Sequence, residues 1–234
     1  MKHIIISDIH GRSIWKDILE EEKTFDKVIF LGDYFDSFDI DIDTQIKNFQ
    51  EIVNFKNENY DKVHLLVGNH DYHYLDFTNS KYSGYSEIIK LNGIVKRHLD
   101  LFEMCYQYNQ YLCTHAGISS EFMQRLNKLY KGDEYEICNI LNDCFKYTPQ
   151  LFDFAVMAND MEYPDGYGNR MYQSPIWIRP NALERSNLDF NVQIVGHTAQ
   201  DKIKILSNIV LTDCYDTCEQ YVTIEDGLIQ IKTL

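Results

Sequence analysis

Residues 2–11 read KHIIISDIHG, and this stretch decides the fold class. The β-branched run at positions 2–7 predicts a buried strand, and the polar turn after it carries Asp8 and His10. Four later apolar runs also end in a polar turn, reading GDYFD, GNHD, THAG and GHT. Short buried strands that alternate with turns and helical stretches are typical of an α/β fold.

The hydrophobic pattern assigns the remaining elements. Strands are predicted over 2–7, 27–31, 62–67, 101–108, 111–114, 192–195, 202–211, 219–224 and 228–232. Helices are predicted over 13–22, 44–57, 121–130 and 134–146, the third capped by Ser119 or Ser120. Asp226-Gly227 predicts the tight turn of a terminal hairpin. With parallel-type strands early and antiparallel ones late, we expect two packed mixed β-sheets flanked by helices.

Length and composition indicate one domain with a sizeable core. The chain has 234 residues, 44% of them apolar, and no Pro-, Gly- or Ser-rich stretch divides it. We therefore expect residues 1–234 to form a single domain. Residues 118–175 carry none of the recurring polar turns, and we expect them to form a small helical cap over the crevice.

Charge and cysteine usage narrow the functional classes. The formal charge is −14, so a long nucleic acid is not an expected partner. No segment approaches the roughly 20 apolar residues of a membrane helix, and no membrane association or signal peptide is expected. The six cysteines form no CxxC pair, which predicts free thiols and a cytoplasmic protein. The oligomeric state stays open.

The five polar turns are the candidate functional site. Ligands of α/β sheets gather at the carboxyl ends of strands, because the loops there open onto a shared crevice. Asp8 and His10 stand two apart on extended chain, so both side chains project the same way. A mixture of carboxylate, imidazole and amide oxygen suits Mn, Fe, Zn or Co better than Ca. The turns therefore predict a site for transition metal ions.

The motifs DIHG, GDYFD, GNHD, THAG and GHT, in this order from position 8 to 198, resemble those of the calcineurin-like metallophosphoesterases. They look closest to the branch that contains phosphoprotein phosphatases, phage phosphatases and diadenosine tetraphosphate hydrolases. The resemblance implies two divalent metal ions, with manganese first among the candidates. It implies these ligands: Asp8 and His10 for the first ion, Asp33 for both, and Asn69, His115 and His197 for the second.

The resemblance also implies a catalytic pair. A phosphate ester would be hydrolysed by in-line attack of a metal-bridging hydroxide, since two cations clamp both oxygens and lower the pKa of a shared water. His70 would give a proton to the leaving group, oriented by Asp36. For Asp71 we expect a hydrogen bond behind the ligands rather than direct metal binding.

The sequence departs from the family pattern at the phosphate-binding positions. Many relatives carry Arg where this chain has Ser37, and a bidentate guanidinium is hard to replace. Arg179, within SPIWIRP, is the expected substrate-binding residue, with Arg12 and then Arg170 as weaker candidates. Ala199 stands where nuclease-type relatives have a second His, so the first ion is expected to have fewer protein ligands and more water.

The expected substrate is a small or exposed phosphate ester. The chain would be a phosphomonoesterase or a hydrolase of nucleotides or dinucleoside polyphosphates; the alternatives are a serine/threonine-type protein phosphatase and a non-catalytic scaffold. His73 is a weak candidate for substrate contact, and Asp39, Asp41 and Asp43 suit a solvated loop. The tyrosine-rich stretch 163–172 suits either a mobile loop that stacks on a substrate ring or an ordinary surface loop.

Overall fold

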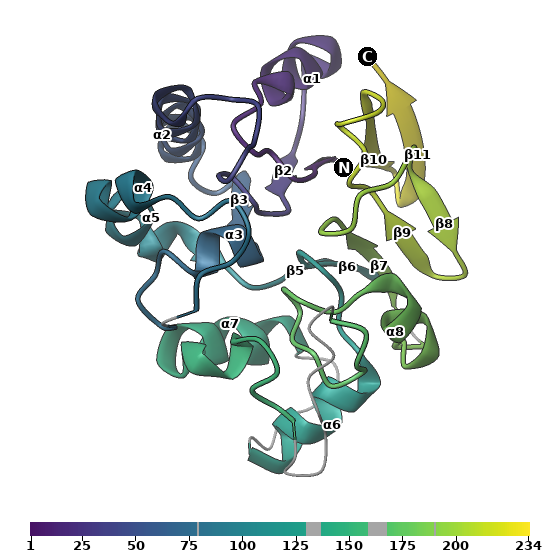
Figure 1. Cartoon of the computed structure of the whole chain (residues 1–234). Coiled ribbons are helices and arrows are strands. Elements are labelled where there is room, and N and C mark those ends of the chain that lie inside the picture. The colour runs from purple at the N-terminus through teal and green to yellow at the C-terminus, as the bar shows by residue number, and fades with distance from the viewer. Residues whose placement is uncertain (79, 130–136, 159–167, 190) are drawn as a thin grey trace.

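The fold is a pair of mixed β-sheets with helices around them (Figure 1). The computed structural model describes residues 1–78, 80–129, 137–158, 168–189 and 191–234. The first sheet has six strands in the order β11-β10-β1-β2-β3-β4, and the second has five in the order β5-β6-β7-β9-β8. The two packed mixed sheets predicted from the sequence are confirmed.

The first sheet carries three of the five motif turns. Its strands are β1 (Lys2–Ile6), β2 (Lys27–Phe30), β3 (Val63–Leu66), β4 (Phe102–Glu103), β10 (Gln220–Glu225) and β11 (Leu228–Thr233). The strands β1 to β4 run parallel, and β10 joins β1 antiparallel. Asp226 and Gly227 both have positive φ, 49° and 82°, as the predicted tight turn between β10 and β11 requires.

The second sheet carries the other two turns. Its strands are β5 (Tyr106–Tyr108), β6 (Tyr111–Cys113), β7 (Val192–Val195), β8 (Lys204–Leu206) and β9 (Ile209–Leu211). β6, β7 and β9 are parallel to one another, with an antiparallel strand at each edge. The expectation of antiparallel strands late in the chain is therefore wrong for β7 and β9, because the segments between them return to the same end of the sheet.

Helices cover the outer surfaces. They are α1 (Ile14–Glu22), α2 (Ile42–Glu58), α3 (Asn69–Tyr72), α4 (Glu87–Asn92), α5 (Ile94–Arg97), η1 (Leu99–Leu101), α6 (Ser120–Leu129), α7 (Ile137–Tyr147), η3 (Pro149–Phe152) and α8 (Pro180–Arg185). α2 begins where Asp41 accepts a hydrogen bond from the Thr44 amide at 3.0 Å. Ser119 is the predicted cap of α6, and its Oγ accepts from the Phe122 amide at 2.9 Å.

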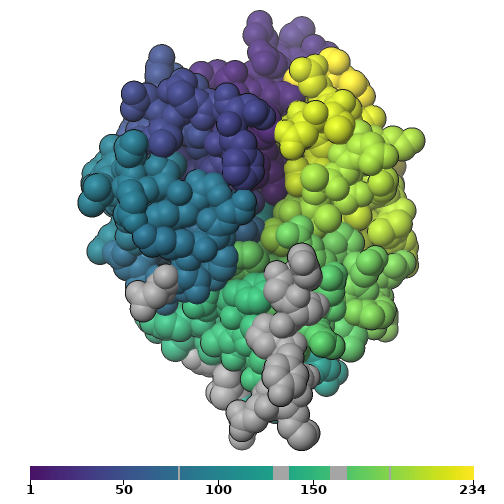
Figure 2. Space-filling model, viewed as in Figure 1, coloured from purple at the N-terminus to yellow at the C-terminus, as the bar shows by residue number. Residues whose placement is uncertain are grey.

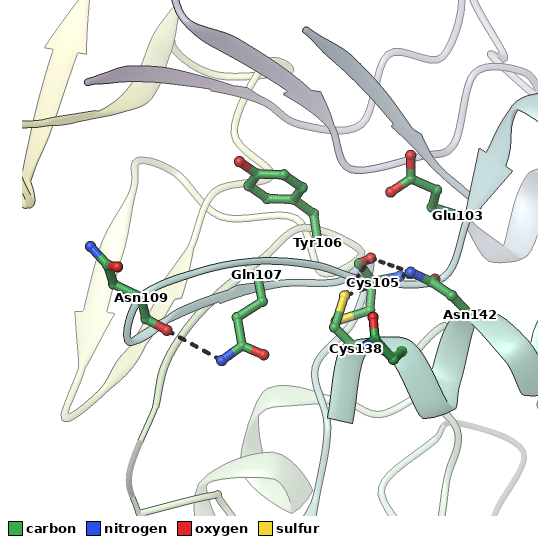
Figure 3. Close-up of a pocket in the computed structure, with 8 residues that line it drawn as sticks. Glu103, Cys105, Tyr106, Gln107, Asn109, Cys138 and Asn142 are labelled. Atoms are coloured by element: carbon green, nitrogen blue, oxygen red, sulfur yellow. Dashed lines mark hydrogen bonds between the residues drawn. The ribbon is translucent and has the colours of Figure 1, made fainter. Parts of the chain in front are cut away.

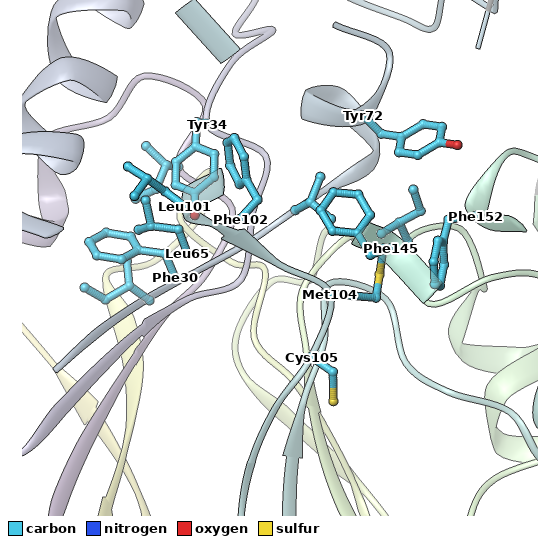
Figure 4. Packing of buried hydrophobic residues seen from close by; sticks show 14 of the residues in the cluster. Phe30, Tyr34, Leu65, Tyr72, Leu101, Phe102, Met104, Cys105, Phe145 and Phe152 are labelled. Carbon is cyan, nitrogen blue, oxygen red and sulfur yellow. The ribbon is translucent and has the colours of Figure 1, made fainter. Parts of the chain in front are cut away.

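Strand alternation divides the core into two main layers. Ile4 and Ile6 point to the helix-covered side of the first sheet, whereas Ile5 points to the second sheet. Figure 4 shows the helix-side cluster extending from Phe30 on β2 to Phe145 on α7. Since α7 shares this cluster, the segment predicted as a cap is packed on the main core. The single-domain assignment stays a prediction.

Two predicted strands are each divided in the structure. The segment 101–108 leaves the first sheet after β4, because the Asn142 side chain accepts from the Met104 and Cys105 amides at 2.7 and 3.0 Å. The segment 202–211 is a hairpin, turned at Ser207, which has a φ of 56°. In both cases the apolar run continues through a turn, so hydrophobicity alone gives one strand instead of two.

Three further findings concern the remaining expectations. None of the helices in the described residues combines the length and apolar character needed to span a lipid bilayer. All six cysteines are free, as predicted. Of the tyrosine-rich stretch 163–172, residues 163–167 lie outside the described part of the chain, and Tyr172 is buried.

Candidate metal centre

The five motif turns meet at one end of the two sheets. Each follows the carboxyl end of β1, β2, β3, β6 or β7, all of which are parallel strands of their sheet. Three groups of possible ligands result, in which the ligand atoms lie within 4.8 Å of one another. One consists of Asp36, His70 and His73; the other two, the candidate metal groups, are Asp8, His10 and Asp33, and Asp33, His115 and His197. Asp33 belongs to both candidate metal groups.

The group around the two late histidines also contains Asn69. Asn69 Oδ1 lies 2.9 Å from His115 Nε2 and 2.8 Å from His197 Nδ1. Asp33 Oδ2 lies 3.4 Å from the same His115 nitrogen. Two imidazoles, an amide oxygen and a carboxylate thus converge on one point, which is a donor set suited to a transition metal ion.

The group around the first turn is built on the Asp33 carboxylate. His10 Nε2 lies 3.7 Å from Asp33 Oδ2. Asp8 faces the other loop, since its Oδ1 accepts a hydrogen bond from the His197 amide at 2.8 Å and its Oδ2 accepts from Ser7 Oγ at 2.5 Å. Every metal ligand predicted from the sequence lies in one of the two candidate metal groups or, for Asn69, between two of their members.

Backbone contacts orient two of the imidazoles. His115 Nδ1 lies 2.9 Å from the Leu31 carbonyl, and His10 Nδ1 lies 2.5 Å from the Phe35 carbonyl. A carbonyl can only accept, so each Nδ1 carries a proton, and Nε2 is the ring nitrogen on the side of Asp33 that would bind an ion. Such contacts behind a ligand fix its tautomer and ring direction before an ion binds.

The loops reach these positions through unusual backbone geometry. His10, Asp33, Asp36 and His197 have φ values of 41°, 54°, 67° and 66°, a left-handed region that few non-glycine residues adopt. The turn at Gly196 is as tight, because a Cβ there would lie 1.9 Å from Asp8 Oδ2. Side chains are thereby aimed at the centre at the expense of local strain.

Charges inside the centre oppose the effect of burial. Burial raises the pKa of the Asp33 carboxyl, but the charges of His115 and His70 outweigh it and hold this pKa well below its usual range. Burial likewise lowers the pKa of His115, and the Asp33 charge raises it to about 9. Asp71 accepts hydrogen bonds from the Asp33, Tyr34 and Gly68 amides at 2.8–2.9 Å, which confirms its predicted place behind the ligands.

His197 shows most directly that the residues fit a metal ion. Its ring is buried, and burial together with the charges of His115 and Arg179 lowers its pKa well below 6.5. Its Nε2 has no hydrogen-bond partner among the described residues, and its Nδ1 faces the Asn69 oxygen. A neutral imidazole that has a buried nitrogen without a hydrogen-bond partner is suited to binding a cation.

The predicted catalytic pair is present beside the centre. His70 Nδ1 lies 2.9 Å from Asp36 Oδ2. His73 Nε2 lies 2.8 Å from the same oxygen, and the Tyr74 hydroxyl donates to Asp36 Oδ1 at 2.5 Å. Burial alone would raise the pKa of Asp36, and these donors lower it. The sequence gave His73 little weight as a substrate contact, and its fully buried ring contacts the Asp36 carboxylate instead.

The arginine candidates differ in their surroundings. Arg179 Nη1 donates to the His197 carbonyl at 3.2 Å and to Thr198 Oγ1 at 3.1 Å, which places the guanidinium at the rim of the centre. Arg12 pairs with the exposed Asp216. At the position of the missing arginine, the Ser37 amide donates to Gln45 Oε1 at 3.3 Å. The substrate-binding roles of Arg179 and Arg12 stay predictions.

Asp213 is an acidic residue outside the five motif turns, and no sequence motif pointed to it. Burial, followed by the charges of Asp8 and Asp33, raises the pKa of its carboxyl to about 8. Its side chain therefore lies within electrostatic reach of the metal ligands. The only sequence signal was its position after an apolar run, which many structural aspartates share.

The comparison with protein families decides the identity of this arrangement. The model of the calcineurin-like phosphoesterases matches residues 1–201. The chain belongs to the calcineurin-like phosphoesterase family. Membership in this family agrees with the two candidate metal groups that share Asp33.

Individual relatives of this calcineurin-like phosphoesterase are distant. It is 29% identical over 223 residues to the serine/threonine-protein phosphatase 2B catalytic subunit A2 of Saccharomyces cerevisiae, a match that covers 84% of this chain and 35% of that protein. The chain thus spans about a third of that relative's length.

Solved structures share the fold. The cold-active protein-tyrosine phosphatase of a Shewanella species superposes with a TM-score of 0.62 at 18% identity, covering 100% of this chain and 80% of that chain. A protein serine/threonine phosphatase from S. cerevisiae gives 0.60 at 13% identity, covering 100% and 79%.

Proposed function

We propose that the chain is a dinuclear metal-dependent phosphoesterase that acts on phosphomonoesters, nucleotides or dinucleoside polyphosphates. One observation carries the proposal: Asp33 belongs to both candidate metal groups, as a carboxylate shared by two ions must. Asp8 and His10 would hold the first ion, and Asn69, His115 and His197 the second. Manganese is the ion that we propose, with Fe, Zn or Co as the other candidates.

When bound, the two ions would neutralise the phosphate oxygens and supply a nucleophilic water at neutral pH. The protein would place the substrate for in-line attack, with Arg179 as the cationic contact at the rim. His70 would hold the proton for the leaving oxygen on Nε2, because its Nδ1 faces Asp36. Burial lowers the pKa of His70, but the charges of Asp33 and Asp36 raise it to about 8, so the ring carries this proton near neutral pH.

The test is metal analysis of the purified chain, followed by a phosphate-release screen with added Mn²⁺. The screen should contain p-nitrophenyl phosphate, nucleotides, dinucleoside polyphosphates, cyclic nucleotides and phosphopeptides. We expect two ions per chain and turnover of at least one compound. Bound metal without turnover of any compound would instead support the scaffold alternative. Short RNA is added as a further substrate, and a preference for it would contradict the proposed small-ester class.

A serine/threonine-type protein phosphatase is the second candidate. It is favoured by the 29% identity with the yeast phosphatase 2B catalytic subunit. The phosphopeptide arm of the same screen separates the two candidates. A phosphoserine or phosphothreonine peptide hydrolysed with a higher kcat/KM than any nucleotide would favour the protein phosphatase.

A further inference from the structure

A polar pocket adjoins the candidate metal centre and has no role in the proposal so far. It encloses about 500 Å³. Arg179, Thr198, Gln200 and Lys204 contribute its main polar lining, and Leu206 and Leu211 its apolar side. A pocket of this size accommodates a small group rather than a long polymer.

Strand register places the pocket at the metal end of the second sheet. Val195, the last residue before the Gly196-His197 turn, pairs with Leu211, and Leu211 pairs with Lys204. Neighbouring strands are about 4.8 Å apart, so the Lys204 backbone lies about 10 Å from that of Val195. A lysine side chain at this level can reach a group that extends from the metal centre.

Arg179 lies between the two sites. Its Nη1 donates to the His197 carbonyl and to Thr198 Oγ1, which ties the guanidinium to the loop that carries a metal ligand. The same arginine and Thr198 also line the pocket. A substrate held at the metal ions and passing Arg179 would therefore enter this pocket.

The charge of the pocket is opposite to that of the chain. The chain has 36 acidic and 22 basic residues, yet the described residues that line the pocket include Arg179 and Lys204 and no carboxylate. Lys204 Nζ lies 3.6 Å from Asp201, whose side chain is 87% exposed, so solvent screens this pair. Two cations without a carboxylate in the lining favour an anionic ligand.

We propose that this pocket binds a second phosphate group of the substrate, while the phosphate to be cleaved lies at the metal ions. The inference rests on the proposed function and narrows it to esters that carry two linked phosphates, such as nucleoside diphosphates or dinucleoside polyphosphates. Lys204 supplies the charge that recognises the distal phosphate, and the amide of Gln200 adds a donor.

Two non-hydrolysable inhibitors test the pocket. Methylphosphonate carries one phosphonate, whereas methylenediphosphonate carries two that are linked through carbon. Both are assayed as competitive inhibitors of p-nitrophenyl phosphate turnover by the full chain in excess Mn²⁺, so that neither inhibitor removes ions from the site. Direct chelation of site-bound ions is separated from pocket binding by the Lys204 variants. We expect methylenediphosphonate to bind at least tenfold more tightly, because a hydrogen bond to a charged group contributes about that factor.

The variant Lys204→Met removes the charge and keeps the aliphatic stem. It should weaken the binding of methylenediphosphonate about fivefold to tenfold. The binding of methylphosphonate and the KM of p-nitrophenyl phosphate should stay unchanged. The matched control is Lys202→Met, an exposed lysine two residues away that does not line the pocket, which should change neither inhibitor. Lys204→Arg should restore most of the difference.

Two results would overturn the inference. One is equal affinity of the parent chain for the two inhibitors; the other is a Lys204→Met variant that methylenediphosphonate inhibits as strongly as it inhibits the parent. These results leave the proposed function standing if p-nitrophenyl phosphate is still hydrolysed. If no turnover occurs with any metal, calorimetric titration of the same inhibitors into the same variants tests the pocket independently of catalysis. A loss of binding confined to Lys204→Met supports the pocket in that case too.

Discussion

Two histidine clusters lie at opposite ends of the parallel strands, and the pKa values of their histidines are shifted in opposite directions. At the carboxyl ends, His115 and His70 face Asp33 and Asp36, which raise their pKa values to about 9 and 8 against the effect of burial. At the amino ends, His3 is equally buried, and burial lowers its pKa to about 4.

The amino-end cluster is aromatic rather than acidic. The His3 ring lies 4.0 Å from that of Tyr108, and the His64 ring 4.4 Å from that of Tyr106. Glu103 Oε1 lies 3.0 Å from His64 Nδ1 and is part of the pocket lining that Figure 3 shows. The charge of Asp26 acts on His3, but burial outweighs it. Among the described residues, neither His3 nor His64 belongs to a group that could hold a metal ion. The comparison teaches that burial alone lowers the pKa of a histidine, as at His3, whereas the charges of Asp33 and Asp36 reverse this effect at the carboxyl ends.

The largest effect is expected for Asp33→Asn, which removes the carboxylate that both candidate metal groups share. Losing a residue that merely orients a ligand already lowers activity by about 10–100-fold, so losing the bridging ligand should lower kcat/KM by more than about 10³-fold. Metal analysis should show fewer than two ions per chain. The control is Asp39→Asn, at an exposed aspartate nearby. Unchanged metal content in Asp33→Asn would refute the shared-ligand assignment.

The next largest effect is expected for His70→Asn. Removal of the proton donor should lower kcat by about 10²–10⁴-fold while metal content stays unchanged. The loss should be greater for phenyl phosphate than for p-nitrophenyl phosphate, because a poorer leaving group needs the proton more. Equal losses for the two esters would argue against His70 as the general acid.

A smaller effect is expected at His73, because it contacts Asp36 of the proposed catalytic pair and not the substrate. His73→Phe removes a donor from Asp36 and should lower kcat by about 10–100-fold without loss of metal. The effect should again depend on the leaving group, since Asp36 acts through His70. His73→Gln, which keeps an N–H donor, should recover part of the rate. A rate loss independent of the leaving group would indicate a purely structural role for His73.

The smallest effect is expected at the amino end, and it concerns stability alone. Because folded His3 has a pKa of about 4 and an unfolded histidine about 6.5, the unfolded chain binds more protons between these values. Stability is therefore lost as the pH falls from 6.5 toward 4. His3→Phe should reduce this loss by on the order of 2 kcal/mol, as measured by urea unfolding at pH 7 and pH 5. Equal pH dependence in both chains would contradict the assigned shift.

The sequence was sufficient for features determined over a few residues. The strand before each polar turn and the ligand in the turn were predicted together, so Asp8, Asp33 and His197 could be named before any coordinates. The sequence alone did not predict contacts between loops that are far apart in the chain. Asp36 and His73 are 37 positions apart, and only the packing of the α3 region against the GDYFD turn brings them together.

The same reason explains the misplaced strand ends. The segment 101–108 is divided where its Met104 and Cys105 amides donate hydrogen bonds to Asn142 on α7, a residue that the local sequence pattern cannot connect to it. The short helices α3, α4, α5 and α8 were not predicted, because four to six residues give too weak a periodicity. In Figure 2 the N-terminal residues (purple) lie directly beside residues near the C-terminus (yellow), although the two segments are far apart in sequence.

The left-handed backbone at His10, Asp33, Asp36 and His197 sets a condition for anyone who would transplant this centre. Copying the side chains onto another sandwich would not suffice, because the same residues on ordinary extended loops would point away from one another. A successful graft needs the positive φ angles at these four positions, and it needs a scaffold rigid enough to hold the backbone in that conformation.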